Sequence, residues 1–280
     1  MFDNPKTGLA LTLPAAIFAA ALFLVPVAIL LSEAFRGPEG QWSVTAYFDF
    51  FADPRYRAVF WRTLRLGLYV TLSAAVIGYA VAYAIVQLGP VARGRIFGLV
   101  ILPLMISPVA RTYAWLVILG RTGIVNDAIT ALGFPPVRLL FTETAVFIGL
   151  LQLFMPLMIV SLISAMENMP RDAVAAARML GANWFQVFWK VILPLTREGL
   201  VIGGTLVFTG SLTAYITPAI LGGSKVLMLE TLLYQRVSVA QDFASASVIA
   251  MILILLCFGA NLALRRLASV RNRSARRAAA

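Results

Sequence analysis

Long apolar runs are the feature that most limits what this sequence can fold into. Runs of about 20 residues with few charges recur along the chain, and a helix needs that length to cross the hydrocarbon core of a bilayer. Of the 280 residues, 61% are hydrophobic and only 12% are charged, whereas a soluble domain has roughly 25% charged residues. A β-barrel would instead show short segments of alternating polarity. The sequence therefore predicts an all-α, polytopic membrane protein.

Six of these runs are predicted to be transmembrane helices. In chain order they are Gly8–Leu31, Val59–Leu88, Ile96–Leu119, Thr144–Ala165, Val191–Leu212 and Ser245–Leu264. Prolines fall inside the third run (Pro103 and Pro108) and the fourth (Pro156), and Pro194 marks the entry to the fifth. The first run is longer than the apolar core of a signal peptide, which has about 7–15 residues, so we expect it to be retained.

The segments between the runs differ in character. Residues 33–58 are rich in aromatic side chains and are expected to contain a short amphipathic helix at the membrane interface. Residues 120–143 are expected to form a turn, a short helix from about Val125 and a second turn. Residues 214–233 hold proline, glycine and charged residues. This favours a loop or re-entrant element packed against protein, since non-helical backbone is not tolerated against lipid.

The distribution of basic residues predicts the orientation. With the N-terminus inside, the inner segments hold 13 of the 23 Lys and Arg residues but only four acids, and cytoplasmic loops are enriched in Lys and Arg. Both termini are then cytoplasmic. The chain is thus predicted to comprise a first helix with a periplasmic segment (1–58), a domain of five helices (59–264) and a basic cytoplasmic tail (265–280). The tail is expected to lie on anionic lipid rather than to bind nucleic acid.

The sequence offers no set of residues for catalysis or metal binding. It has no histidine, and its one cysteine, Cys257, lies in an apolar run, which supports neither a disulfide framework nor a metal site. No phosphate-binding loop of the Gly-x-x-x-x-Gly-Lys-Ser/Thr type occurs, and no nucleophile–base pair stands out. We expect neither a catalytic residue nor a cofactor bound by this chain.

The long inner segment Glu167–Pro194 is predicted to form two short helices joined at an angle. Asp172 complements the positive end of the first helix, whose residues up to Leu180 are strong helix formers. Gly181 is placed to end that helix in a left-handed conformation. Asn183 can then cap a second helix, with Gln186 three residues further on. The residues alone leave open whether this hairpin lies on the membrane or contacts another protein.

This segment resembles the signature of the membrane subunits of binding-protein-dependent ABC importers. The signature is Glu-Ala-Ala, three residues, Gly, nine residues, Ile, one residue and Leu-Pro. The same spacing occurs here, with the glutamate replaced by Ala175 and the isoleucine by Val191. The resemblance implies a MetI-like fold with a cytoplasmic coupling helix pair between spans four and five, which docks into a groove of a separate ATPase. The implied coupling residues are Asp172, Ala175, Ala176, Ala177, Leu180, Gly181, Ala182, Phe185 and Pro194.

Two further stretches resemble permeases of the spermidine/putrescine type. They are Ser107–Leu119, followed by Gly123 and Asn126, and Ala214–Gly223. The resemblance implies a multi-pass protein of the bacterial inner membrane. Its implied partners are a second homologous permease subunit, two cytoplasmic ATPase subunits that use ATP and Mg²⁺, a periplasmic solute-binding protein and membrane lipid.

A small group of polar and aromatic residues is expected to line the solute pathway. Arg111 is the main ionisable residue inside a predicted span, and such residues are functional candidates. It can also have a structural role, by binding carbonyls near Pro108 or by extending to the interface. The other candidates, which packing alone also explains, are Tyr113, Trp115, Gln152, Tyr215 and Thr217.

The sequence leaves the solute open. A polyamine or related amine is implied by the resemblance, yet no acidic residue lies well inside any predicted span. The partner permease can supply that acid, or the pathway can bind weakly and leave selection to the external binding protein. The solute can also be another small molecule such as an opine, an amino-acid derivative or an organic anion. A secondary transporter and a structural membrane protein are the alternatives of another class. The first predicts more intramembrane ionisable residues, and the second leaves the signature spacing unexplained.

Overall fold

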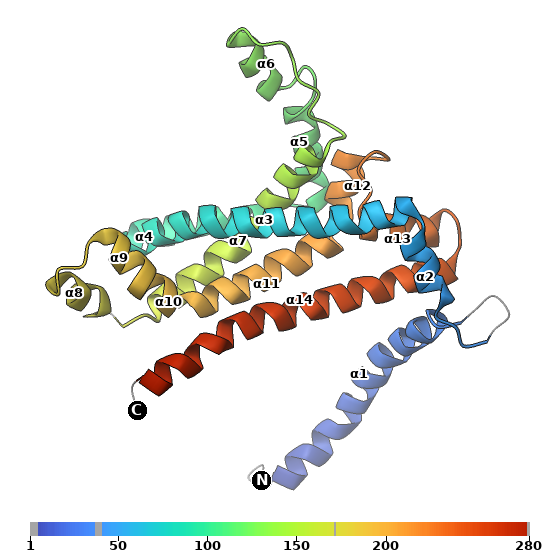
Figure 1. The fold of residues 1–280 in the computed structure, drawn as a ribbon, viewed down its shortest axis with the longest axis horizontal. Coiled ribbons are helices and arrows are strands. Elements are labelled where there is room, and N and C mark those ends of the chain that lie inside the picture. Colours follow the sequence, from blue (N-terminus) through green and yellow to red (C-terminus); the bar gives the residue numbers. More distant parts are fainter. Residues whose placement is uncertain (1–4, 37–40, 171, 279–280) are drawn as a thin grey trace. The chain divides into compact units, whose positions relative to one another are not determined.

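The computed structural model describes residues 5–36, 41–170 and 172–278, which are almost entirely helical (Figure 1). The longer helices are α1 (Pro5–Glu33), α3 (Pro54–Val86), α4 (Pro90–Met105), α5 (Pro108–Ile118), α7 (Glu143–Glu167), α11 (Arg197–Thr213) and α14 (Phe243–Ala278). The shorter ones are α2 (Thr45–Ala52), α6 (Ile124–Ala131), α8 (Asp172–Met179), α9 (Trp184–Val187), the π-helix η1 (Phe188–Ile192), α10 (Leu193–Leu195), α12 (Ile216–Gly222) and α13 (Leu229–Ser238).

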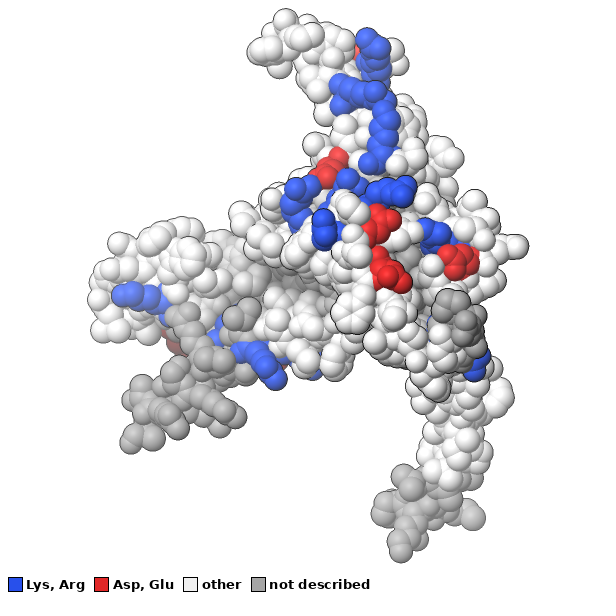
Figure 2. Space-filling view, turned by 45° about the vertical axis from the view of Figure 1, so that its right-hand side comes forward, with Lys and Arg blue, Asp and Glu red and all other residues white. Residues whose placement is uncertain are grey.

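Four helices are by themselves long and apolar enough to cross a bilayer, namely the stretches Thr12–Glu33, Pro54–Val86, Glu143–Glu167 and Phe243–Arg266. Two further pairs qualify only together: α4 with α5, bent by 96°, and the run Trp184–Leu195 with α11, bent by 67°. The predicted six spans correspond to counting each bent pair once. Much of the visible surface carries no charge, and the charged side chains gather in a few groups (Figure 2).

Short helices occur in the segments between the predicted spans. The expected interfacial helix is α2, and the expected helix near Val125 is α6. Residues 214–233, predicted as a loop or re-entrant element, form the short helix α12, a turn and the start of α13. The backbone of the predicted tail continues α14 to residue 278. Asp3 and Arg171, which entered the orientation argument, lie outside the described residues, as do the side chains of Lys6 and of the tail from residue 267.

The chain divides into two compact units, one of residues 1–57 and 233–254 and the other of residues 58–232 and 255–280. In the first unit, Arg236 contacts Asp242 at 3.4 Å and donates a hydrogen bond to the Tyr56 hydroxyl. Hydrogen bonds from Ser245, helped by Arg236, hold the pKa of the Asp242 carboxyl below its ordinary value of 3.8. The stability that this carboxylate adds is therefore present above that value and is lost as the pH falls through the lowered pKa.

In the second unit, helices α7 and α11 lie side by side and approach closely at two glycines (Figure 1). A methyl group on Gly199 would lie 2.6 Å from the Ser161 carbonyl oxygen and would also overlap the Ala165 side chain. A methyl group on Gly203 would lie 2.7 Å from the Met158 sulfur. The spacing Gly-x-x-x-Gly lets two helix backbones approach in a membrane, where packing rather than water exclusion holds helices together.

We expect Gly199→Ala to destabilise the protein by about 1–3 kcal/mol, because the new methyl group meets a backbone carbonyl that cannot move away alone. Gly204→Ala is the matched control on the same helix, since its methyl group would only touch the Thr71 methyl at 3.8 Å. Thermal unfolding of the two purified variants in detergent measures the difference. Equal unfolding midpoints for the variants would show that α7 and α11 are free to separate.

Candidate functional site

The turn between α7 and α11, which we call the coupling turn (residues 167–194), has the predicted local structure. Gly181 follows α8 with φ +79°. Its N–H donates to the Arg178 carbonyl, and the N–H of Ala182 donates to the Ala177 carbonyl. These two bonds are those of a Schellman motif, which ends a helix on a left-handed residue. The predicted cap of the second helix is also confirmed, because Asn183 and Gln186 form a reciprocal capping box.

One side of the coupling turn is anchored and the other is exposed. Val187 and Ile192 are buried, and the Phe188 ring meets the Tyr79 ring of α3 edge-on at 5.2 Å. The tip, by contrast, presents large apolar side chains to the outside, including Leu180 with 88% exposure. The large apolar side chains exposed at the tip are those of Met179, Leu180, Trp184 and Phe185. A surface of this kind is suited to contact with another protein.

The nine predicted coupling residues therefore fall into two groups. Ala177 and Ala182 are half-buried and pack against the core. The others are exposed: Asp172, Ala175, Ala176, Leu180, Gly181, Phe185 and Pro194. Their role in docking stays a prediction, but the structure leaves most of them accessible within this chain.

The change of direction between the coupling turn and α11 occurs at Thr196. Pro194 was predicted to mark the entry to the fifth span, but it lies inside the short helix α10, and the bend comes two residues later. Proline lacks the N–H that would continue the helical ladder. Thr196 is fully buried, and its hydroxyl bonds both the Ile192 carbonyl, at 2.8 Å, and the Tyr79 hydroxyl. Helix α3 thus holds the bend.

Four of the six predicted pathway residues make side-chain hydrogen bonds that involve α5, α7 or α12. Arg111 is 9% exposed and donates to the Pro103 carbonyl at 2.7 Å, across the break. On the same helix, Trp115 donates to Gln152 of α7 at 3.4 Å. Thr217 of α12 faces the hydroxyl of Thr112 at 3.4 Å. The structure therefore brings α5, α7 and α12 together through polar side chains.

The two tyrosines predicted for the pathway are more exposed than Arg111 and Thr217. Tyr113 lies on α5 but is 56% exposed, and Tyr215 is half-buried just before α12. Thr112, which the sequence reasoning missed, is buried and contacts Thr217. Its position next to Arg111 in an apolar run is the signal that would have found it, because a hydroxyl there needs a partner within the protein.

Carboxylates stand at helix ends rather than among these residues. Glu143, the first residue of α7, accepts from Arg62 at 3.0 Å and from Arg65 at 2.5 Å, both on α3. Glu167, the last residue of α7, pairs with Arg93 of α4. Among the described residues, no acid contacts Arg111, Trp115, Gln152 or Thr217 in any of these interactions. The polar group around α5 therefore offers one guanidinium and several neutral hydrogen-bonding groups.

We expect Arg111→Met to lower stability by about 1–3 kcal/mol, because the half-buried Pro103 carbonyl loses its charged donor. Arg111→Lys is the matched control, since an ammonium group can still donate one bond. Thermal unfolding in detergent and solute uptake are measured for both. If Arg111→Met unfolds like the wild type but loses uptake, the guanidinium acts on the solute and its structural role is contradicted.

Comparison with known proteins decides the family. Residues 74–270 match the family described as binding-protein-dependent transport system inner membrane component. The chain belongs to this family. It is therefore a multi-pass, inner-membrane component of a transport system rather than an enzyme.

Relatives and solved structures agree with this assignment. The spermidine/putrescine transport system permease protein PotB of Haemophilus influenzae is 34% identical over 245 residues, covering 84% of this chain and 85% of that protein. PhnU of Salmonella paratyphi A, provisionally named for 2-aminoethylphosphonate transport, is 26% identical over 260 residues, covering 91% of this chain and 89% of that protein. A chain of a bacterial alginate ABC transporter, solved with its periplasmic protein, superposes with a TM-score of 0.77 at 17% identity, covering 93% and 95% of the two chains. At that identity the likeness supports the fold alone.

Proposed function

We propose that this ABC importer permease is driven through its coupling turn by a separate cytoplasmic ATPase, and that it carries a polyamine. The observation that supports the first part is the coupling turn itself. Local hydrogen bonds fix its shape, buried side chains anchor it to α3, and an exposed apolar tip is left for a partner. Movement of a docked ATPase would then reach both α7 and α11, between which the turn lies.

The proposed assembly contains a second homologous permease, two ATPase subunits and a periplasmic solute-binding protein. ATP and Mg²⁺ belong to the ATPase, so this chain needs no cofactor of its own. The N- and C-termini are on the cytoplasmic side in this arrangement, as the basic residues indicate. The coupling turn is then cytoplasmic, and α6 and α12 face the periplasm.

We expect Gly181→Trp to abolish co-purification of the ATPase and solute uptake. The residue would force a bulky side chain onto a backbone with φ +79° and into the docking surface. Gly133→Trp is a closely matched control, because Gly133 also has positive φ, +85°, and also has no neighbouring atom within 4 Å of an added Cβ. Pull-down from membranes and uptake into cells are the measurements.

Two results would contradict the coupling proposal. One is that no ATPase co-purifies with the wild-type chain. The other is that the assembled Gly181→Trp variant transports as well as the Gly133→Trp control, because the tip would then not be a docking surface.

The solute assignment rests on the relatives. The PotB relative, named for spermidine and putrescine, is the more similar of the two reported, and it covers most of this chain. A polyamine is a polycation, which aromatic side chains such as Trp115 can bind through cation–π contact. Because no carboxylate joins the polar group around α5, we propose that the partner permease supplies the acid that a polyamine needs.

An anionic or zwitterionic solute is the second candidate, favoured by one observation. Arg111 is buried on the helix that also carries Thr112 and Trp115, and among the described residues no ion pair joins it to a carboxylate. A guanidinium in such a place suits a phosphonate or carboxylate. The PhnU relative, with its 26% identity, makes this class worth testing beside polyamines.

We expect spermidine, presented by its binding protein, to stimulate ATP hydrolysis by the complex reconstituted in proteoliposomes. Unlabelled putrescine should compete with labelled spermidine for uptake, and 2-aminoethylphosphonate should not. Stimulation and competition by 2-aminoethylphosphonate alone would contradict the polyamine assignment and favour the anionic class, while leaving the coupling proposal intact.

A further inference from the structure

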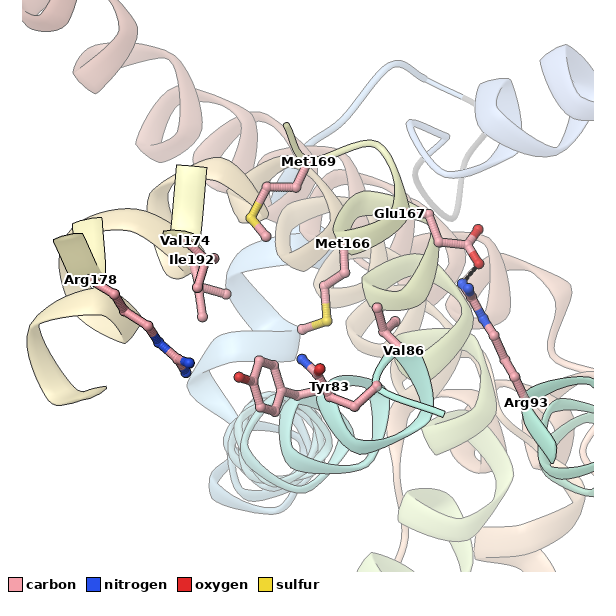
Figure 3. A pocket seen from close by; sticks show the side chains of 10 residues that line it. Tyr83, Val86, Arg93, Met166, Glu167, Met169, Val174, Arg178 and Ile192 are labelled. Atoms are coloured by element: carbon pink, nitrogen blue, oxygen red, sulfur yellow. Dashed lines mark ion pairs between the residues drawn. The ribbon is translucent and has the colours of Figure 1, made fainter. Parts of the chain in front are cut away.

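An ion pair joins the start of the coupling turn to a helix outside it. Glu167 is the last residue of α7 and the first of the coupling turn, and its carboxylate pairs with the Arg93 guanidinium on the first turn of α4 (Figure 3). The two side chains are 29% and 47% exposed. The pair therefore connects two segments that lie far apart in the sequence.

Both residues of this pair line two cavities. One, of about 600 Å³, is also lined by Tyr83, Met166, Val174 and Arg178. The other, of about 450 Å³, is also lined by Leu88, Phe97, Val160 and Ile163. Part of the space around the ion pair is thus not filled by apolar packing.

Helix α4 has little else to hold it to the rest of the second unit. None of its residues is buried, and only Phe97 and Val100 pack against the core. A helix with few buried contacts has low local stability, so its position depends on the contacts that connect it to stiffer parts of the protein. On the side of the coupling turn, the polar connection is the pair between Arg93 and Glu167.

The connection continues from α4 into the solute region. Arg111 of α5 donates to the Pro103 carbonyl near the end of α4, across the 96° bend. From α5, polar contacts lead to α7 through Trp115 and to α12 through Thr112. A displacement of α4 therefore reaches the group of residues proposed to line the pathway.

The link from the coupling turn to Glu167 is short. Only four residues separate Glu167 from α8, and within them Asn168 donates twice to the Ser164 carbonyl, through its backbone and its side chain. The N–H of Ala173 donates to the Pro170 carbonyl. Described hydrogen bonds therefore occur at both ends of this short link, at the end of α7 and at the start of α8.

We propose that the Arg93–Glu167 ion pair is a strut through which the coupling turn moves α4 and α5. Both are positioning residues, since neither is placed in the solute pathway or on the docking surface. The inference rests on the proposed function, because it needs an ATPase to move the turn. It adds a route to the pathway that leaves α7 at its last residue, Glu167, and continues through α4 and α5.

Arg178 of α8 is a third charged residue close enough to the ion pair's cavity to affect the choice of variants. Its guanidinium extends into the same cavity, on the side of Tyr83 (Figure 3). Reversing the charge of Glu167 alone would line this cavity with three cations, which disturbs more than the pair. Restoring the pair in the opposite sense is the informative variant, because it returns the attraction and keeps the total charge.

The test uses the full transporter with Cys257→Ser as background and spin labels on Val117→Cys of α5 and Ile202→Cys of α11. Both label sites are exposed within this chain. The distance between the labels is measured without nucleotide and with ATP and vanadate, so no solute is required. We expect a nucleotide-dependent shift in the background protein, its loss in Arg93→Glu and in Glu167→Arg, and its return in the double variant.

Transport gives a second readout, with labelled spermidine as the probe. The single reversals should keep their rate of ATP hydrolysis but transport at least about fivefold less solute per ATP hydrolysed. The double variant should recover the transport of the background protein. Arg95→Glu is the matched control, since Arg95 is exposed two residues along the same helix and lines neither cavity. It should behave like the background protein.

The strut is contradicted if either single reversal keeps the full distance shift, or if the double variant assembles without regaining it. If the single reversals fail to assemble, Arg93→Gln and Glu167→Gln replace them, and a full shift in these neutral variants contradicts the strut as well. Loss of assembly in every single variant, with no recovery in the double, would make the pair a folding contact and overturn the proposal. Failure of the ATPase to bind the background protein would instead contradict the proposed function.

Discussion

The close contact between α7 and α11 is the interaction on which the rest of this unit depends. At Gly199 and Gly203 the two backbones approach so closely that no side chain fits between them. In a bilayer, lipid tails compete with apolar side chains as neighbours, so close packing of this kind is what keeps two helices together. Because the coupling turn leaves from α7 and returns to α11, both of its ends are tied to one stiff pair.

The stiffness of that pair contrasts with the loose attachment of α4, the helix that leads into α5. The first of these has no buried residue, and the second is joined to it only across a break of two residues. Motion entering at the coupling turn would therefore be distributed unevenly. Helices α7 and α11 would move as one, and α4 would follow only as far as its few contacts, including Arg93 with Glu167, can carry it.

Much of this arrangement could be predicted from the sequence, because the patterns that indicate it lie within short stretches of the chain. Apolar runs are necessary for spanning helices, and turn chemistry at Gly181 and Asn183 depends on residues within a few positions. The direction of each bend could not be read, because the side chains that fix it, Arg111 at one bend and Tyr79 at the other, act on segments whose position is set by tertiary packing.

The candidate site shows the same division. The coupling turn was predicted closely because its signature is continuous. The pathway group was predicted in part, since Thr112 and its contact with Thr217 join α5 to α12 across a long stretch of chain. The Gly-x-x-x-Gly spacing of Gly199 and Gly203 is present in the sequence, but the close helix contact at these residues was not predicted. The Arg93–Glu167 pair left no local pattern, because its partners come from separate helices.

The shape of the coupling turn has a consequence for how a partner associates with it. The Schellman motif at Gly181 and the capping box at Asn183 are made entirely within residues 177–186. The tip is therefore ordered before any partner arrives, and docking removes little backbone entropy. In the proposed assembly, an ATPase would meet the same surface at each encounter, and no folding step of the tip would slow its return.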